Sequence, residues 1–140
     1  MMKKLRDELC EKNYSILAVR DGFTYTSFLS GIKPVLLPMR ENREHFKDCR
    51  VVDKVIGKAS AMLLILSGVK EVYGLVMSKS AVTLLEERGI PYGYDRLEDV
   101  ILNIAGDDMC PMEKTVLNID TPEEAFEALD AKLKSLAQKR

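Results

Sequence analysis

The feature that most constrains the fold of this chain is the stretch at residues 51–78, VVDKVIGKASAMLLILSGVKEVYGLVMS. No polar residue interrupts it from Met62 to Leu66, which predicts a helix that neighbouring elements cover on all sides. Gly68 is placed to end this helix, and the apolar run after it is typical of a buried strand. A helix followed by a hydrophobic strand is half of a βαβ unit, so the stretch predicts an α/β fold with parallel strands.

The first turns of this helix, which we expect to start near Val51, are polar. Asp53 and Gly57, and likewise Lys54 and Lys58, are four residues apart, which places them on one face near the positive end of the helix. Two lysines one turn apart repel each other by a few tenths of a kcal/mol, a cost that a nearby anion would remove. This pattern predicts a ligand site for a phosphate or carboxylate.

Ser78 and Ser80 open the next predicted helix, so their hydroxyls and backbone N–H groups are expected to complete the ligand site. The alternative is that the lysines are solvated, or paired with Asp53 or Glu71. Gly57 permits close approach of a ligand, yet it equally suits tight packing of the helix.

The rest of the chain predicts a hairpin, further helices and one more strand around this unit. Asp21-Gly22 separates two β-rich runs and is typical of a tight hairpin turn. We expect helices at residues 2–12, 38–46, 78–88, 95–104 and 121–136, and a strand at residues 90–94. This order predicts a single domain over residues 1–140, with a mixed sheet covered on both faces in a three-layer α/β/α sandwich, and a ligand site beyond the carboxyl ends of the parallel strands.

Charge, apolar run length and cysteine content disfavour several classes of partner and location. The 21 basic and 22 acidic residues are mixed along the chain, so no nucleic-acid partner is expected. The longest apolar run, at residues 61–66, is far shorter than the roughly 20 residues that span a bilayer, and no membrane partner is expected. Three widely spaced cysteines and a charged start favour a reducing cytoplasm, and an uncovered hairpin edge is compatible with a homodimer.

Two segments resemble a known family. The stretch VVDKVIGKASAMLLI with the following GVKEVYGLVMS, and the stretch MCPMEKTVLNID, are similar to the signature segments of a small uncharacterised prokaryotic family. That family is a domain of unknown function assigned to the cytidine-deaminase-like fold, and the match covers nearly the whole chain. The resemblance implies a hairpin first, then a central helix and parallel strands. It implies no established activity.

The zinc ligands of deaminases have no counterpart here. These enzymes carry an H-x-E motif at the start of the central helix and a P-C-x-x-C motif at the start of the helix after the next strand. The corresponding positions read Asp53-Lys54-Val55 and Met77-Ser78-Lys79-Ser80-Ala81. A catalytic zinc needs three protein ligands, so no standard zinc site is expected and the cofactor is left unknown.

Cys110 is the sharpest candidate for chemistry. In Cys110-Pro111-Met112-Glu113 the proline suits the first position of a helix, which makes Cys110 its N-cap. A thiol at a helix N-terminus is favoured as the nucleophilic thiolate. The alternative is an inert cap or a buried cysteine, with Glu113 completing the cap of the same helix.

Three hypotheses follow for the function. In the first, the chain binds a small anionic, nucleotide-like metabolite, with Cys110 as the nucleophile or covalent attachment point and Lys54 and Lys58 on the charged group. Asp53 is a candidate general base, or it stabilises the first turn of the helix electrostatically. In the second, it is a non-catalytic binding or regulatory module that kept the pocket. In the third, Asp53, Cys110 and Glu113 hold a metal for an atypical hydrolase or deaminase.

Overall fold

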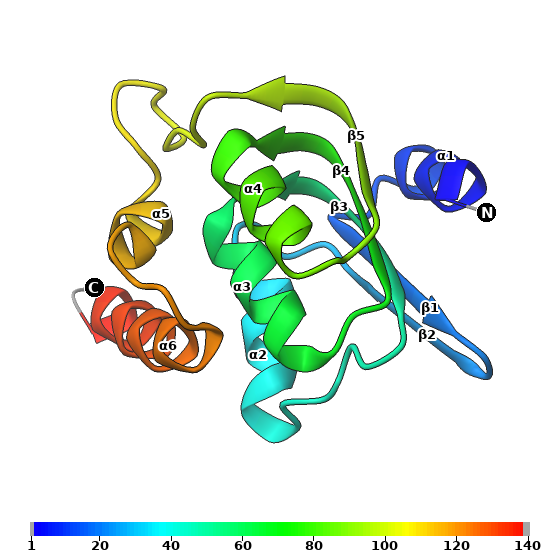
Figure 1. Cartoon of the computed structure of the whole chain (residues 1–140), viewed down its shortest axis with the longest axis horizontal. Helices are drawn as coiled ribbons and strands as arrows, with labels where there is room; N and C mark the ends of the chain where they lie inside the picture. The colour runs from blue at the N-terminus through cyan, green and yellow to red at the C-terminus, as the bar shows by residue number, and fades with distance from the viewer. Residues whose placement is uncertain (1, 139–140) are drawn as a thin grey trace.

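The computed structural model describes residues 2–138, and its central element is the helix α3 (Lys58–Ser67). One side of α3 lies against the sheet, and the outer helices α5 (Pro111–Val116) and α6 (Pro122–Gln138) pack on its other side (Figure 1). Contact on both sides explains why α3 is apolar all round, with five consecutive residues from Ala61 to Ile65 that carry no charge. The predicted cover on all sides is confirmed for Ala61 to Leu64, which are buried, whereas Ile65 and Leu66 are partly buried.

The sheet has five strands in the order β2-β1-β3-β4-β5. The strands are β1 (Ile16–Arg20), β2 (Phe23–Ser27), β3 (Arg50–Ile56), β4 (Glu71–Ser78) and β5 (Tyr92–Glu98). β1 runs antiparallel to both β2 and β3, whereas β3, β4 and β5 are mutually parallel. The predicted α/β fold with a mixed sheet is confirmed.

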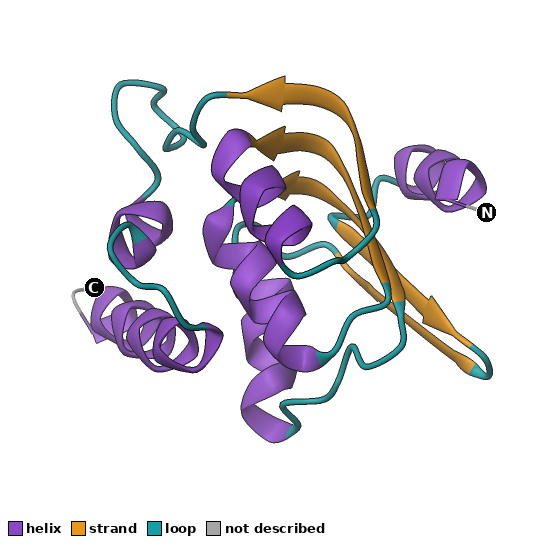
Figure 2. Cartoon of the chain, in the orientation of Figure 1, coloured by secondary structure: helices purple, strands orange, loops and turns teal. Residues whose placement is uncertain are grey.

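Helices lie on both faces of the sheet, but unequally (Figure 2). The helix α1 (Met2–Lys12) packs by itself on one face, where Leu5 and Leu9 cover Leu17 and Val52 in a small core. The other face carries α2 (Lys33–Glu41), α3 and α4 (Lys79–Glu87), which form the main core. α5 and α6 add a further layer outside α3.

Elements with strong local signals form as predicted. The Asp21-Gly22 turn joins β1 to β2, with Gly22 at φ +74°. Ser78 caps α4 by accepting a hydrogen bond from the Ala81 backbone N–H, and Gly89 follows the helix in the left-handed conformation. The Thr121 hydroxyl accepts from the Glu124 N–H at the start of α6.

The predicted start of the central helix at Val51 is wrong, because residues 50–56 form β3 and the helix begins only after Gly57. The segment is rich in β-branched valines, and it pairs with β1 on one side and β4 on the other. Asp53 and Lys54 are therefore strand residues. Lys54 and Lys58 are not one helical turn apart, and the four polar residues do not share one helix face.

Two further predicted helices are corrected. The helix at residues 38–46 instead spans Lys33–Glu41, with Pro34 in its first turn and Pro38 inside it. Pro38 cannot donate to the Pro34 carbonyl, and the Tyr25 hydroxyl donates to that oxygen instead, at 2.7 Å. Residues 95–98, predicted as a helix start, belong to β5, because they extend the parallel pairing with β4. The chain after β5 is irregular up to α5.

Candidate functional site

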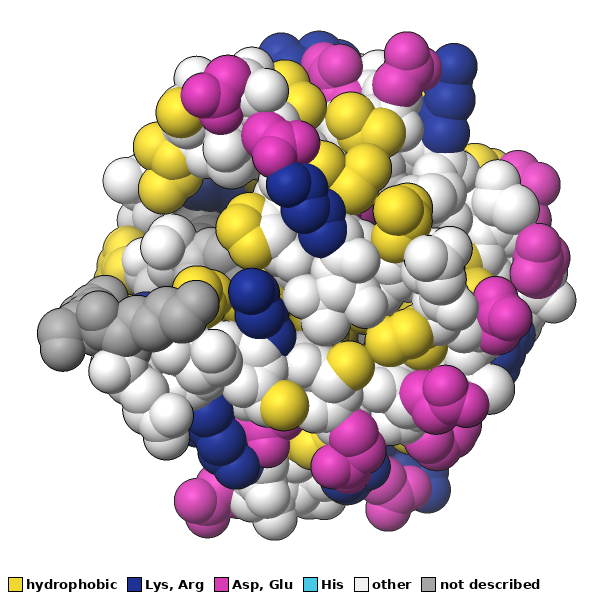
Figure 3. Space-filling model, turned by 90° about the vertical axis from the view of Figure 1, so that its left-hand side faces the viewer, with side chains coloured by type: hydrophobic (Ala, Val, Ile, Leu, Met, Phe, Trp, Pro, Cys, Tyr) yellow, Lys and Arg dark blue, Asp and Glu magenta, His cyan; other side chains and the backbone are white. Residues whose placement is uncertain are grey.

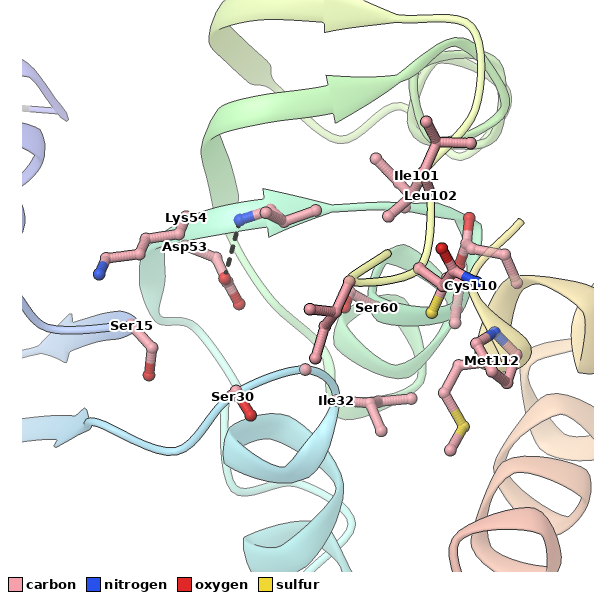
Figure 4. Close-up of a pocket in the computed structure, with 18 of the residues that line it drawn as sticks. Ser15, Ser30, Ile32, Asp53, Lys54, Ser60, Ile101, Leu102, Cys110 and Met112 are labelled. Atoms are coloured by element: carbon pink, nitrogen blue, oxygen red, sulfur yellow. Dashed lines mark hydrogen bonds between the residues drawn. The ribbon is translucent and has the colours of Figure 1, made fainter. Parts of the chain in front are cut away.

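A pocket of about 750 Å³ opens beside the carboxyl end of β3. Three segments that are distant in sequence surround it: the connection from β2 to α2, the junction from β3 to α3, and the chain from β5 into α5. Its apolar wall includes Phe28, Leu29, Ile32, Ile101, Leu102, Ile104 and Met112. Its polar side chains are Ser15, Ser30, Asp53, Lys54, Ser60, Asn103, Cys110 and Glu113 (Figure 4).

Asp53 is the most unusual of these polar groups, because it is a carboxyl with only 6% of its surface exposed. Side chains alternate along β3, so Val52 faces α1 and Asp53 faces the pocket on the opposite side. Asp53 Oδ1 accepts a hydrogen bond from the Val55 backbone N–H at 3.2 Å. No lysine, arginine or histidine forms a salt bridge with Asp53 within residues 2–138.

Burial raises the pKa of Asp53 from 3.8 to about 7. The backbone N–H groups of Val55 and Lys54, and the charge of Lys54, act in the opposite direction but do not offset the loss of hydration. Asp53 therefore exchanges its proton near neutral pH, which is the property that a general acid or base needs.

The sequence suggested that Glu113 completes the cap of its own helix, α5. In the structure it caps α3 instead. Its Oε1 accepts from the Lys58 backbone N–H and its Oε2 from the Ala59 N–H, each at 2.8 Å. α5 packs across the start of α3, which brings this carboxylate to the positive end of the neighbouring helix. Burial raises the pKa of Glu113, and the two N–H groups lower it in part.

Gly57 is the residue that makes this cap possible. A Cβ atom at position 57 would lie 2.7 Å from Glu113 Oε2 and closer still to Oε1. The sequence suggested that Gly57 allows either a ligand or a packed neighbour to come close to the backbone. In the structure the group that lies close to it is the protein's own Glu113 carboxylate. The start of α3 is thus an anion site already filled by the protein.

The two lysines point away from the pocket. Lys54 Nζ donates to Asn13 Oδ1 at 2.8 Å, at the end of α1, and Figure 4 shows its side chain extending outward. Lys58 Nζ donates to the Leu117 carbonyl oxygen at 3.2 Å, beyond the end of α5. Neither ammonium group is directed at the interior of the pocket.

Ser78 and Ser80 lie outside the pocket. Ser78 is buried at the start of α4, where it caps the helix and its hydroxyl lies 3.1 Å from that of Ser80. Of the residues expected at the ligand site, Asp53 and Cys110 both line the pocket, whereas Ser78 does not. Asp53 pairs with Gly74 in the middle of β4, whereas Ser78 stands at the end of that strand, where α4 begins.

Cys110 stands at the N-cap position of α5, as predicted, with Pro111 following it. Its side chain makes no capping hydrogen bond, and the side chain is partly buried in the pocket wall. Asp53 and Cys110 lie at opposite sides of the pocket, with Ser60 between them in the view of Figure 4. Within residues 2–138, no His, Cys, Asp and Glu side chains gather in a group of three that could hold a metal ion, so Asp53, Cys110 and Glu113 do not form a ligand set.

The residues that correspond to the H-x-E motif of zinc deaminases lie a few positions later than the sequence suggested. Because Asp53-Lys54-Val55 lies on β3, the start of the central helix is occupied by Gly57, Lys58 and Ala59. These residues carry no side-chain zinc ligand either, since zinc is bound by sulfur, imidazole or carboxylate groups.

Sequence reasoning missed Ser60, Ser30 and the apolar wall of the pocket. Ser60 lies in the first turn of α3, next to the residues that Glu113 caps. Residues 95–104 were expected to form a helix, so the apolar residues at its end were assigned to a buried helix face. In the structure the side chains of Leu102 and Ile104 are exposed. Figure 3 shows one face of the molecule, on which hydrophobic side chains are exposed among acidic and basic ones.

None of the helices in the described part of the chain has the length and apolar character needed to cross a membrane.

Comparison with known proteins identifies close relatives by family and structure. The family model described as TM1506, a domain of unknown function (DUF1893), matches residues 4–133. A crystal structure described as a DUF1893 family protein (TM1506) from Thermotoga maritima is similar to this chain, with 31% sequence identity and a TM-score of 0.83. The similarity covers 94% of this chain and 88% of that one. A search of curated proteins found no match.

Proposed function

The chain belongs to the DUF1893 family of domains of unknown function, and we propose that it binds a small organic molecule in the Asp53 pocket. The observation that carries this proposal is a buried carboxyl facing a cavity of about 750 Å³ whose other walls are largely apolar. Small-molecule sites commonly have this volume and this pattern of a few polar groups in an apolar wall.

The acid–base properties of Asp53 support a role in contact with the ligand. A buried carboxyl costs stability unless something compensates it, and Asp53 has no cationic partner within residues 2–138. Groups whose pKa is shifted by burial in a cleft are enriched at functional sites. Asp53 would donate or accept a hydrogen bond to the polar part of the ligand, according to its protonation state.

Binding without a covalent step is the form of the proposal that the geometry favours. An adjacent base is one way to activate a cysteine, and within residues 2–138 no side-chain hydrogen bond joins Cys110 Sγ to such a base. Cys110 would then contact the ligand from the pocket wall, and its role as a nucleophile stays a prediction.

The cytidine-deaminase-like fold belongs to the same proposal. The hairpin comes first, followed by a central helix between parallel strands, which is the order that the resemblance implies. This order supports the assignment without any of the zinc chemistry. A cytoplasmic location and a homodimer stay predictions.

The proposal is tested by titrating benzamide, a small planar neutral probe, into the isotope-labelled protein and observing its methyl NMR signals. Ile32 and Ile101 line the pocket, so their signals should shift saturably with a Kd of about 1 mM, while that of Ile16 in the sheet core should not. Ser60→Phe should fill the pocket and abolish the shifts. Ser80→Phe, on the exposed surface of α4, is the matched control and should leave them unchanged.

Two results would contradict the proposal. One is the absence of any saturable shift at Ile32 and Ile101 with benzamide and also with its charged analogues benzamidine and benzoate. The other is binding that survives Ser60→Phe while the dispersed methyl spectrum shows that the variant is folded.

A further inference from the structure

We propose that the pocket selects ligands that carry a cationic, N–H-rich group, such as an amine, amidine or guanidine, on an apolar body. This inference rests on the proposed function and deepens it by naming the ligand class. It also reverses the anionic ligand that the sequence suggested. The observations that carry it are the charges in the pocket wall and the contacts that each of them already makes.

The first observation is the unused acceptor capacity of Asp53. An ionised carboxylate has about four acceptor sites, and the Val55 N–H at 3.2 Å occupies one of them. A bound N–H group would supply the missing donor to a carboxylate that is 6% exposed and has no salt bridge within residues 2–138. A bound cation would compensate the negative charge of the buried carboxylate, which has lost its hydration.

The second observation is that the positive groups near the pocket are already engaged. Lys54 Nζ bonds to Asn13, and Lys58 Nζ bonds to the Leu117 carbonyl. The N-terminal N–H groups at Lys58 and Ala59 bond to the Glu113 carboxylate. An anionic ligand could not use these four donors without displacing their present partners, and it would be placed between the Asp53 and Glu113 carboxyls.

The third observation concerns the rest of the ligand. The wall facing Asp53 is built from Ile32, Ile101, Leu102 and Met112, so the body of the ligand is apolar. The titratable side chains in the wall besides Asp53 are Lys54, Cys110 and Glu113. Of these, Glu113 holds α3 through both oxygens, which leaves Asp53 as the carboxylate that can engage a ligand.

The test compares benzamidine, benzamide and benzoate, three planar molecules of nearly the same shape with charges of +1, 0 and −1. At pH 8 we expect benzamidine to bind at least about tenfold more tightly than benzoate, as measured by the shifts at Ile32 and Ile101. Its affinity should rise about tenfold from pH 6 to pH 8, because the pKa of Asp53 is about 7 and only the ionised form attracts the cation.

Asp53→Asn preserves the shape and removes the charge, so it should abolish both the preference for benzamidine and its pH dependence. Asp120→Asn is the matched control and should retain the preference and the pH dependence, because Asp120 is an exposed carboxyl outside the pocket wall. The Asp53→Asn variant keeps Lys54, Cys110 and Glu113. If the affinity for benzamidine no longer depends on pH in this variant, Asp53 is the group whose titration caused the dependence.

The two proposals fail in different ways. If benzoate or benzamide binds in the pocket as tightly as benzamidine, or if Asp53→Asn keeps the preference, the cation class is wrong and small-molecule binding stands. If none of the three probes shifts the pocket signals, both proposals are wrong.

Discussion

Glu113 shows how one side chain changes the interpretation of a motif. Two lysines and a glycine before an apolar helix predicted an anion at a helix N-terminus, and an anion is there, but it is the protein's own carboxylate. Gly57 provides the space for it. The dipole of α3 favours an anion at its N-terminus, and this could be inferred from the sequence. Which anion binds there depends on the packing of α5 against α3.

At this scale we predict that Gly57→Ala destabilises the protein by about 2 kcal/mol, because the added methyl group forces the Glu113 carboxylate away from the Lys58 and Ala59 N–H groups. Glu113→Ala should cost about 1–2 kcal/mol through loss of the cap. Urea unfolding measures both.

The double variant distinguishes this explanation from a general intolerance of position 57. Since Glu113→Ala removes the group that clashes, Gly57→Ala should cost well under 1 kcal/mol in that background. Strictly additive effects would show that the two residues do not interact as described.

At the scale of elements, the two sides of the sheet differ in how securely they are covered. One face is buried under α2, α3 and α4, while the other depends on α1. α1 is also tied to β5, where Arg6 Nη2 contacts Asp95 Oδ2 at 2.7 Å and the Tyr73 hydroxyl bonds to the same carboxylate. The predicted helix at residues 2–12 is confirmed, and Leu5 and Leu9 lie on its buried side.

We therefore expect Leu9→Ala to destabilise the protein by about 2–4 kcal/mol, because the Leu9 side chain of α1 is fully buried against the sheet and its truncation leaves a cavity over Leu17 and Val52. The comparison is Leu136→Ala, in the last turns of α6, where the side chain is 38% exposed and the cost should stay below about 1 kcal/mol. Chemical denaturation of the two variants is the measurement, and equal costs would mean that α1 contributes little to stability.

At the scale of the whole molecule, the pocket exists only because three distant segments meet. Asp53 comes from β3, the apolar wall from the connection between β2 and α2 and from residues 101–105, and Cys110 from the start of α5. The same closure removes Asp53 from water and raises its pKa, so global stability should respond to pH through this residue.

The sign follows from the direction of the shift. The folded-state pKa of Asp53 lies above its ordinary value of 3.8, so its contribution to stability is fully present below pH 3.8 and is lost as pH rises through about 7. Relative to Asp53→Asn, the wild type should lose between about 1 and 4 kcal/mol from pH 5 to pH 8, since one pKa unit corresponds to about 1.4 kcal/mol.

Urea unfolding at pH 5, 6, 7 and 8 measures this difference. The exposed residue Asp120 supplies the control, because Asp120→Asn should keep the pH dependence of the wild type. If Asp53→Asn follows the same pH dependence as the wild type, Asp53 is not the buried titrating group.

The sequence by itself determined the elements whose hydrogen bonds are local. The Asp21-Gly22 turn, the Ser78 cap and the Thr121 cap each satisfy backbone groups within a few residues, so their patterns were sufficient. The cover around α3 was also determined, because a helix that is apolar on every side has to be buried.

Tertiary structure decided the elements and contacts that depend on distant partners. Residues 50–56 and 95–98 had patterns compatible with a helix, and pairing with β4 made both of them strands. The direction of Lys54, the partner of Glu113 and the burial of Asp53 were settled in the same way, by segments dozens of residues away. A local pattern records which groups need a partner, whereas the packing of the whole chain selects which partner is within reach.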